Sequence, residues 1–465
     1  MYKTPGKLLL LLIATHIFLS ACNKENFIQS SNATLTLSAD TIKFDTVFTT
    51  AGSITQSVKI FNTNTQPLRI SEIKLMGGNN SAYHMNVNGI ANTTVNDYEL
   101  AANDSMYIFV TVDINPNNQN QPFLINDSIS IAWNGNTRFI QLEAYGQNAH
   151  YLNRHTISQH ETWINDLPYV ILGELTVEAG ATLNISAGCR IFCHADAPIL
   201  VNGTIQVNGE KNNEVVFRGD RLDTYYRDLP ASWPGIYLLP GSGGHQFRFA
   251  NILNAYQALV VSETSNATTI EQSIIHNSYK EGLLAKKSEL NVSNSLISNC
   301  GGGVALMAGG NYQFTHCTMV TYANAYTSHN TPTLSISNYE IDNGNISSYD
   351  LSAIFVNCIC WGEGSTDTEI ETRKEGNTLY AVEWKNCLFK AATDPANALY
   401  TDVIRNEDPQ FDSIDISHQY YDFRTTRNSF APGIDRGVVT PFPKDLDDNP
   451  RVVATFPDLG CYERQ

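Results

Sequence analysis

A phrase that recurs every 22 residues in the middle of the chain constrains the fold more than any other feature. Equivalent positions fall at Ile252, Ile274, Leu296 and Thr318, in the segments FANILN, EQSIIHN, SNSLISN and THCTMVT. A fixed period of this size is typical of stacked supersecondary units. Leucine-rich repeats would add spaced leucines and a helical half. Here β-branched runs alternate with Asn, Gly and Ser, which suit tight bends, so the repeat predicts a parallel β-helix.

Two columns of like residues support stacked coils. The column just before the repeat position holds small side chains that we expect to point inward: Asn251, Ser273, Ser295, Cys317, Cys358, Cys387. The preceding column predicts an amide ladder at a turn, with each amide bonding its neighbours above and below: Ala250, Gln272, Asn294, His316, Asn357, Asn386. The strict period lapses after Thr318. We expect residues 322–350 to leave the coil as loops, which often form the binding face of a solenoid.

The region upstream of these repeats shows the same architecture in another register. In ELTVEAGATLNISAGCRIFC, apolar pairs recur at steps of eight, with glycines at 173, 180 and 188. This segment resembles the opening coils of right-handed parallel β-helix proteins of the pectin-lyase-like architecture. The likeness extends from about Trp163 to about Lys390 and predicts a β-helix over residues 150–395. It implies a fold but no chemistry, because the architecture hosts lyases, hydrolases, adhesins and spacers.

A separate domain is predicted over residues 35–148. Short alternating runs such as TLTLSADTIKF and SMYIFVTVDI are separated by turn clusters such as NPNNQNQP. About seven such strands predict an antiparallel β-sandwich. The pattern resembles the immunoglobulin-like domains of bacterial surface proteins, which implies a spacer or docking module. The expected fold class is therefore all-β.

The N-terminus indicates export. Residues 1–21 join two lysines to a short apolar core and end in Leu19-Ser20-Ala21, directly before Cys22. Leu-Ser-Ala-Cys resembles the bacterial lipobox, which implies that Cys22 becomes a lipidated first residue and residues 22–34 a tether. The alternative is a secretory signal with a chance cysteine. The resemblance implies a lipid-anchored protein of the cell envelope, at the outer membrane of a Gram-negative bacterium.

The acidic composition excludes some partners. The chain has 46 acidic residues against 29 basic ones, a formal net charge of −17. Such a protein should repel nucleic acid, so we expect no nucleic-acid partner. Eight cysteines remain beside Cys22, an even number that would allow disulfides in an oxidising envelope. Their inward and ladder positions favour buried thiols instead. Histidine pairs at zinc-binding spacing do not accompany them, so we expect no metal there.

The tail, residues 396–465, resembles the closing segment of bacterial β-helix surface proteins. It carries EDPQFDS, SFAPGIDRG, DLDDNPRV and FPDLGCYE in the same order as that family. We expect this segment to cap the open end of the helix and cover its strand edges. We expect no cofactor other than calcium, which four of its carboxylates could hold, and the alternative is that they bond turn amides: Asp435, Asp445, Asp447, Asp448.

The best candidate binding site is the segment RGDRLDTYYRDLPASW at 218–233. Sugar rings stack on aromatic faces while charged groups bond hydroxyls. The residues expected to contact a glycan are Arg221, Asp223, Tyr225, Tyr226, Arg227 and Trp233. The alternative is a loop braced by its own ion pairs. No catalytic constellation of a polygalacturonase or pectate lyase is recognisable, so catalytic residues are not assigned.

Three functions remain open at the sequence level. The first is a membrane-anchored surface lipoprotein whose β-helix binds glycan or another envelope polymer without catalysis. The second is a polysaccharide lyase or glycoside hydrolase with an unfamiliar site. The third is an envelope scaffold or adhesin with a protein partner. The missing catalytic constellation favours the first over the second.

Overall fold

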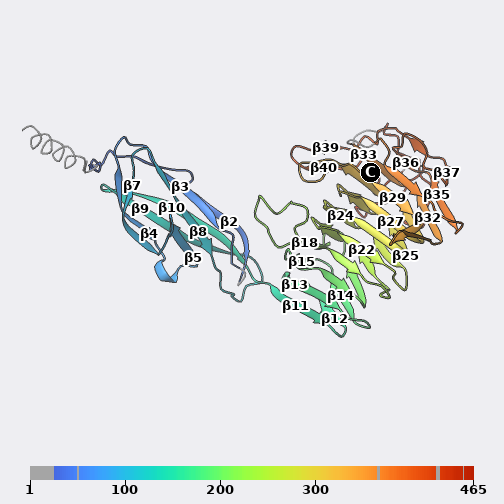
Figure 1. The fold of residues 1–465 in the computed structure, drawn as a ribbon, viewed down its shortest axis with the longest axis horizontal. Helices are drawn as coiled ribbons and strands as arrows, with labels where there is room; N and C mark the ends of the chain where they lie inside the picture. The colour runs from blue at the N-terminus through green and yellow to red at the C-terminus, as the bar shows by residue number, and fades with distance from the viewer. Residues whose placement is uncertain (1–25, 50–51, 364–366, 426–429, 454) are drawn as a thin grey trace, which may run out of the picture. The chain divides into compact units, whose positions relative to one another are not determined.

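The computed structural model describes residues 26–465 except 50–51, 364–366, 426–429 and 454. The chain divides into two compact units, one ending at Asn148 and the other beginning at Ala149 (Figure 1). Over the described ranges the structure is built from strands, with one 3-10 turn, η1 (Gly78–Asn80), and no α-helix. The predicted all-β class, a sandwich followed by a right-handed parallel β-helix, is confirmed. Cys22 lies outside the described residues.

The first unit is a β-sandwich of two five-stranded sheets. The first sheet contains β1 (Leu35–Leu37), β3 (Gln56–Asn62), β8 (Ser105–Val112), β5 (Tyr83–Val87) and β6 (Ile90–Ala91). The second contains β2 (Thr41–Phe48), β10 (Asn136–Gln147), β9 (Phe123–Trp133), β4 (Leu68–Leu75) and β7 (Thr94–Leu100). Alternate residues such as Ile60 and Ile131 are fully buried between the sheets. One pair departs from the expected antiparallel pattern, because β2 runs parallel to β10.

The second unit stacks its strands in three parallel faces. Face 1 contains β13 (Tyr169–Val177, first half), β15 (Arg190–Cys193), β18 (Val215–Gly219), β21 (Ala250–Leu253), β24 (Ile274–His276), β26 (Leu296–Ser298), β28 (Thr318–Tyr322), β33 (Ile359–Glu363), β36 (Leu388–Phe389) and β38 (Ile404–Arg405). Face 2 contains the second half of β13, β16 (Ile199–Val201), β19 (Ile236–Leu238), β22 (Leu259–Ser262), the first halves of β25 (Leu283–Ser293) and β27 (Val304–Thr315), β29 (Leu334–Ser337) and β34 (Ile370–Arg373).

Face 3 completes each coil. It contains β12 (Glu161–Trp163), β14 (Thr182–Ser186), β17 (Thr204–Asn208), β20 (Gln246–Arg248), β23 (Thr268–Glu271), the second halves of β25 and β27, β32 (Leu351–Val356), β35 (Tyr380–Lys385) and β37 (Ala398–Thr401). The strand β11 (His150–Ile157) opens the stack beside β13. Side chains that point inward from the three faces form one continuous core, in which Phe314, Phe355 and Trp384 stack at centroid distances of 5.1 and 4.1 Å.

The repeat holds with one correction. Ile274, Leu296 and Thr318 lie directly above one another at the predicted interval. The first step is one residue longer, because Ile252 pairs with Ile275 rather than with Ile274. The predicted ladder columns are therefore displaced by one residue in this coil.

A one-residue bend, here named the ladder turn, joins face 3 to face 1 in these coils. The residue at the bend has a left-handed φ in each: Phe249, Gln272, Asn294, His316, Asn357, Asn386. The next residue points inward, and here small side chains bond along the stack. The Oγ of Ser273 accepts from the backbone N–H of Ala250 at 3.0 Å, and the Oγ of Ser295 accepts from Ser273 at 3.2 Å. All eight described cysteines are buried free thiols, as predicted.

The C-terminal segment, residues 406–465, is here named the strap, and its position corrects the expected end cap. Its contacts run along the side of the β-helix, where it bonds the ladder turn of successive coils. Gln272 donates to the Asp445 carbonyl at 2.7 Å, and Asn386 donates to the Arg436 carbonyl at 3.0 Å. Within the expected ladder, the side chains of His316 and Asn357 bond each other at 3.0 Å.

The reason for this placement is the outer surface of face 1. Side chains that point outward from it are apolar, including Leu296, Ile359 and Trp361, and they form a small core with Phe423 and Leu459 of the strap. In this position the strap buries apolar surface and pairs with a row of turn residues. At the end of the β-helix it would pair with the backbone groups of one strand edge only.

Three of the four strap carboxylates named as possible calcium ligands, those of Asp445, Asp447 and Asp448, accept hydrogen bonds from protein groups or form ion pairs with them. Asp447 pairs with Lys211 and Arg424, and Asp448 pairs with Lys444, at 2.6 Å in each case. Asp445 accepts backbone N–H groups of Asn449 and Glu463, and the backbone N–H of Asp435 bonds Asp458. The carboxylate of Asp445 therefore bonds backbone amides, as the alternative to calcium binding expects.

The insertion at 322–350 is only partly a loop. Residues 334–337 return to face 2 as β29, with Leu334 and Ile336 in the core. The residues after it form a hairpin of β30 (Tyr339–Asp342) and β31 (Asn345–Ser348). The alternation of apolar and polar residues in LSIS distinguishes this piece from the polar sequence around it.

Candidate functional site

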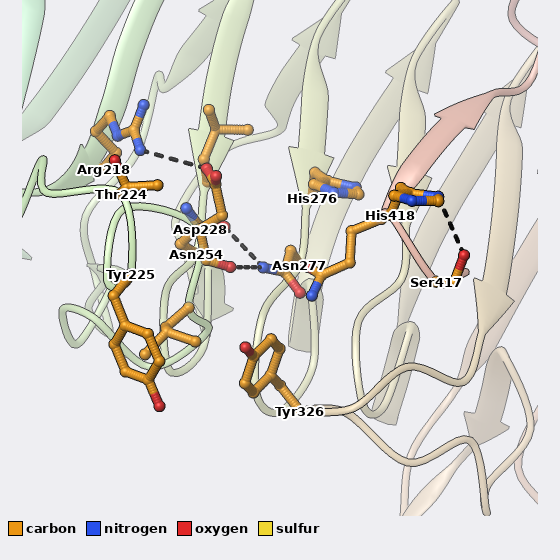
Figure 2. Close-up of a pocket in the computed structure, with 13 residues that line it drawn as sticks. Arg218, Thr224, Tyr225, Asp228, Asn254, His276, Asn277, Tyr326, Ser417 and His418 are labelled. Carbon is orange, nitrogen blue, oxygen red and sulfur yellow. Dashed lines mark hydrogen bonds and ion pairs between the residues drawn. The ribbon is translucent and has the colours of Figure 1, made fainter. Parts of the chain in front are cut away.

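The turn from face 1 to face 2, here named the insertion turn, holds the two longest inserted loops of the described coils, and the coils of β21, β24 and β26 lie between them. One follows β18 and one follows β28, at residues 220–235 and 323–333. Between them lies a pocket of about 410 Å³. A third wall comes from the strap, from residues 417–419 between β39 (Ser413–Asp415) and β40 (Tyr420–Asp422). Three segments far apart in the sequence therefore enclose one site (Figure 2).

Two asparagines form the floor of this pocket. Asn254 and Asn277 occupy equivalent left-handed positions, with φ of 61° and 58°, at the start of the insertion turn in successive coils. The Nδ2 of Asn277 donates to the Oδ1 of Asn254 at 2.8 Å and to the Asp228 carbonyl at 2.9 Å. The Nδ2 of Asn254 donates to the Arg227 carbonyl at 2.8 Å. These bonds hold the loop 220–235 against the coils.

Charged groups of opposite sign flank the floor. Asp228 lies 3.0 Å from the Nε of Arg227 and 3.7 Å from a guanidinium nitrogen of Arg218. Burial lowers the pKa of Arg218, and the nearby Asp228 opposes that shift. On the opposite wall, His418 lies 2.7 Å from Asp415.

Hydrogen bonds and burial set the protonation of the remaining groups. Hydrogen bonds from Ser417 and His418 lower the pKa of Asp415 to about 2. Burial lowers the pKa of His276 to about 4, so this ring is neutral at pH 7. Its Nδ1 lies 2.8 Å from the Oγ of Ser298. The pocket therefore combines a neutral imidazole with paired charges.

Aromatic rings and unsatisfied polar atoms complete the lining. Tyr225 and Tyr326, 69% and 41% exposed, come from the two inserted loops (Figure 2). Two buried atoms, the Nε of Arg218 and the Oδ1 of Asn277, have no hydrogen-bond partner within the described part of the chain. Such atoms cost about 1–3 kcal/mol each when left unsatisfied.

The six residues expected to contact a glycan have different positions. Tyr225 lines the pocket, and Arg227 borders it through Asp228. Arg221 pairs with Asp223 at 2.8 Å and lies 3.9 Å from the ring centroid of Tyr226, so these three residues brace the loop as the alternative interpretation expects.

Trp233 corrects the prediction. It is only 1% exposed, sits in the β-helix core, and donates its indole N–H to the Leu253 carbonyl at 2.8 Å. It cannot contact a ligand in the pocket. Its residue type was read as an aromatic platform, but the loop rejoins the coil at this position and the ring fills the core.

Several pocket residues were not identified as binding residues from the sequence. These are Asn254, His276, Asn277, Tyr326 and His418. A partial signal was present for Tyr326, since its inserted loop leaves the stack at the same turn as the loop 220–235. No sequence signal pointed to His418, because the path of the strap depends on tertiary packing.

Over the described ranges, no group of three or more His, Cys, Asp or Glu side chains is arranged to hold a metal ion. In the same part of the chain, no helix has the length and apolar character needed to cross a membrane.

The comparison with protein families agrees with the fold of the second unit. A family model described as the right-handed β-helix region matches residues 234–390. Among solved structures, the catalytic domain of Agl-KA is 8% identical, covering 76% of this chain and 77% of that one, with a TM-score of 0.28. The periplasmic alginate epimerase AlgG is 9% identical, covering 57% and 85%, with a TM-score of 0.20.

A third solved structure relates to a smaller part of the chain. The ASH/PapD-like domain of human CEP192 is 10% identical, covering 27% of this chain and 92% of that one, with a TM-score of 0.20. At these scores the three likenesses carry no argument. No curated protein sequence matches the chain.

Proposed function

We propose that this chain is a lipid-anchored envelope protein that binds a glycan in the pocket of the insertion turn. The observation that carries the proposal is the lining of that pocket, where two exposed tyrosines border a floor of amides and paired charges. Tyrosine faces stack on the apolar faces of sugar rings, and amide and charged groups bond hydroxyls. The three walls enclose the site without covering it, which suits part of a long polymer.

Native affinity electrophoresis tests the binding. The chain beginning at residue 23, which keeps every described residue, is run through gels that contain plant, host or microbial polysaccharides. The proposal predicts retardation in at least one gel, and loss of retardation in the double variant Tyr225→Ala/Tyr326→Ala. Tyr145→Ala is the matched control, since Tyr145 is 49% exposed but lies in the sandwich. Equal retardation of the double variant would place the binding elsewhere.

A second candidate function is cleavage of the bound glycan, by a lyase or a hydrolase. The observation that favours it is the His418–Asp415 pair, which shares the pocket with Arg218 and Asp228. An imidazole oriented by a carboxylate can act as a general base, and a guanidinium can stabilise a developing negative charge. A cleared zone in the gel that His418→Gln abolishes would establish cleavage. Retardation without loss of polymer would support binding alone.

The anchor is part of the proposal. Leu19-Ser20-Ala21-Cys22 resembles a lipobox, and the sandwich would then act as the spacer between membrane and β-helix, in the manner of an immunoglobulin-like module. A multiply acylated cysteine gives stable membrane attachment. Metabolic labelling with a fatty acid should mark the wild-type chain and not Cys22→Ser. Protease treatment of intact cells then distinguishes surface exposure from a periplasmic location. A label retained in Cys22→Ser would contradict the anchor.

A further inference from the structure

Three neighbouring cavities of the β-helix share their walls. The pocket described above is the first. A second, of about 400 Å³, adjoins it across Tyr326, which lines both. A third, of about 810 Å³, shares Glu281, Gly302 and Thr331 with the second. The three therefore form one path that begins on face 1, rounds the insertion turn and ends on face 2.

We propose that a single extended chain of a neutral, hydroxyl-rich polysaccharide occupies this whole path, an inference that rests on the proposed function. The first cavity then holds one segment of the polymer, and the other two bind the units that follow. Because the path spans three cavities, its ligand is a polymer rather than a short sugar.

The middle of the path is aromatic. Tyr326 stands at the junction of the first and second cavities and is 41% exposed. Tyr279 lines the second cavity, is 48% exposed, and stacks on Tyr256 of the coil below at a centroid distance of 5.7 Å. Exposed rings at successive positions suit the successive sugar rings of one chain.

The third cavity supplies an apolar floor under a hairpin. Leu284, Ala305 and Met307 line it from face 2, and the β30–β31 hairpin contributes Tyr339 and Ile341. The ring carbons of a sugar present an apolar face that can pack on these side chains. Polar groups at its edge can bond the hydroxyls around the ring.

The charges along the path favour a neutral polymer. Lys286 lies 2.7 Å from Glu340, and Arg373 lies 2.7 Å from Glu371, both in the third cavity. Arg218 in the first cavity faces Asp228. Paired cations offer little net attraction to a polyanion, and the chain as a whole has a net charge of −17.

Oligosaccharide length tests the inference. The probes are oligomers of two to eight sugar units, prepared by partial hydrolysis of the polysaccharide that retards the chain most in native gels. Calorimetry should show affinity that rises with length, by on the order of tenfold between the shortest and longest oligomers, and then levels off. Tyr339→Ala should remove much of this gain while leaving the shortest oligomers unaffected. Tyr326→Ala should weaken every length.

The outcomes separate the two proposals. Affinity that does not change with length overturns the extended path but leaves glycan binding at the first cavity intact. Retardation only by acidic polymers, with affinity that falls steeply with salt, overturns the neutral assignment. Retardation by no polymer overturns both the path and the proposed function. Since the shortest oligomers bind only a folded chain, their binding to Tyr339→Ala also shows that this variant is intact.

Discussion

Arg451 attaches the strap to the β-helix, and its replacement by methionine should release the strap locally. The side chain is 1% exposed and donates two hydrogen bonds, of 3.0 and 2.7 Å, to the Oδ1 of Asn294 in the ladder turn. Its Nη1 lies 3.6 Å from Glu463. Arg451→Met keeps much of the packing volume but leaves the Asn294 oxygen buried without a donor. The loss of charge-assisted bonds and the unsatisfied acceptor together destabilise the strap by about 3–5 kcal/mol.

Native-state hydrogen exchange measures this effect where it occurs. The backbone N–H groups of Gly460 and Cys461 bond Asn357 and Thr318 of the β-helix, so they exchange when the strap opens. Because 1.4 kcal/mol corresponds to a tenfold change, exchange should accelerate by about a hundredfold to several thousandfold.

Two further variants make this prediction refutable. Adding Asn294→Gly to Arg451→Met removes both polar partners and tolerates the left-handed φ of 47° at this position, so much of the protection should return. Arg373→Met is the control, since that side chain is 59% exposed and its loss should change stability by less than about 0.5 kcal/mol. Unchanged exchange at Gly460 in Arg451→Met, or a double variant that opens as readily as the single one, would refute the reasoning.

Three more predictions follow from burial and hydrogen bonding. Trp233→Ala should lower the free energy of unfolding of the β-helix by about 3–5 kcal/mol, measured by urea denaturation, because its ring fills the core; a loss below about 1 kcal/mol would contradict that placement. Burial raises the pKa of Glu463 to about 8 from an ordinary 4.5, so the folded chain binds the proton more tightly and the strap should lose stability as pH rises from about 5 to 8. Glu463→Gln should flatten the pH dependence of exchange at Gly460. If that pH dependence is unchanged in the variant, other titratable groups cause it. Asn254→Ala removes the bond to the Arg227 carbonyl, so trypsin should cleave the loop 220–235 faster than in wild type, and equal rates would contradict the anchoring role.

The sequence predicted the architecture because the architecture is periodic. Stacked coils repeat the same local requirements, so turn residues and inward positions recur at intervals that can be counted. The one-residue error at Ile252 arose because a single extra residue in one coil leaves the pattern of residue types almost unchanged. The buried thiols were predicted for the same reason, since Cys317, Cys358 and Cys387 occupy one inward column.

The site was harder to predict because it is not periodic. Tyr225 was identified because its loop is rich in arginine, aspartate and aromatic residues. Tyr326 and His418 reach the same pocket from two other segments, and the 22-residue repeat does not connect either segment with that loop. Trp233 shows the limit of residue type alone, since an indole serves a core as well as a binding surface. The side placement of the strap followed from apolar residues such as Trp361 on the outside of face 1, which the repeat pattern does not distinguish from residues in the core.

The most direct test of the account is a crystal structure of the chain bound to the longest oligosaccharide that it retains. The account predicts sugar density in the pocket between Tyr225 and Tyr326, over Asn277 and beside His418. Density confined to the sandwich, or to a surface of the β-helix outside this pocket, would contradict the central claim.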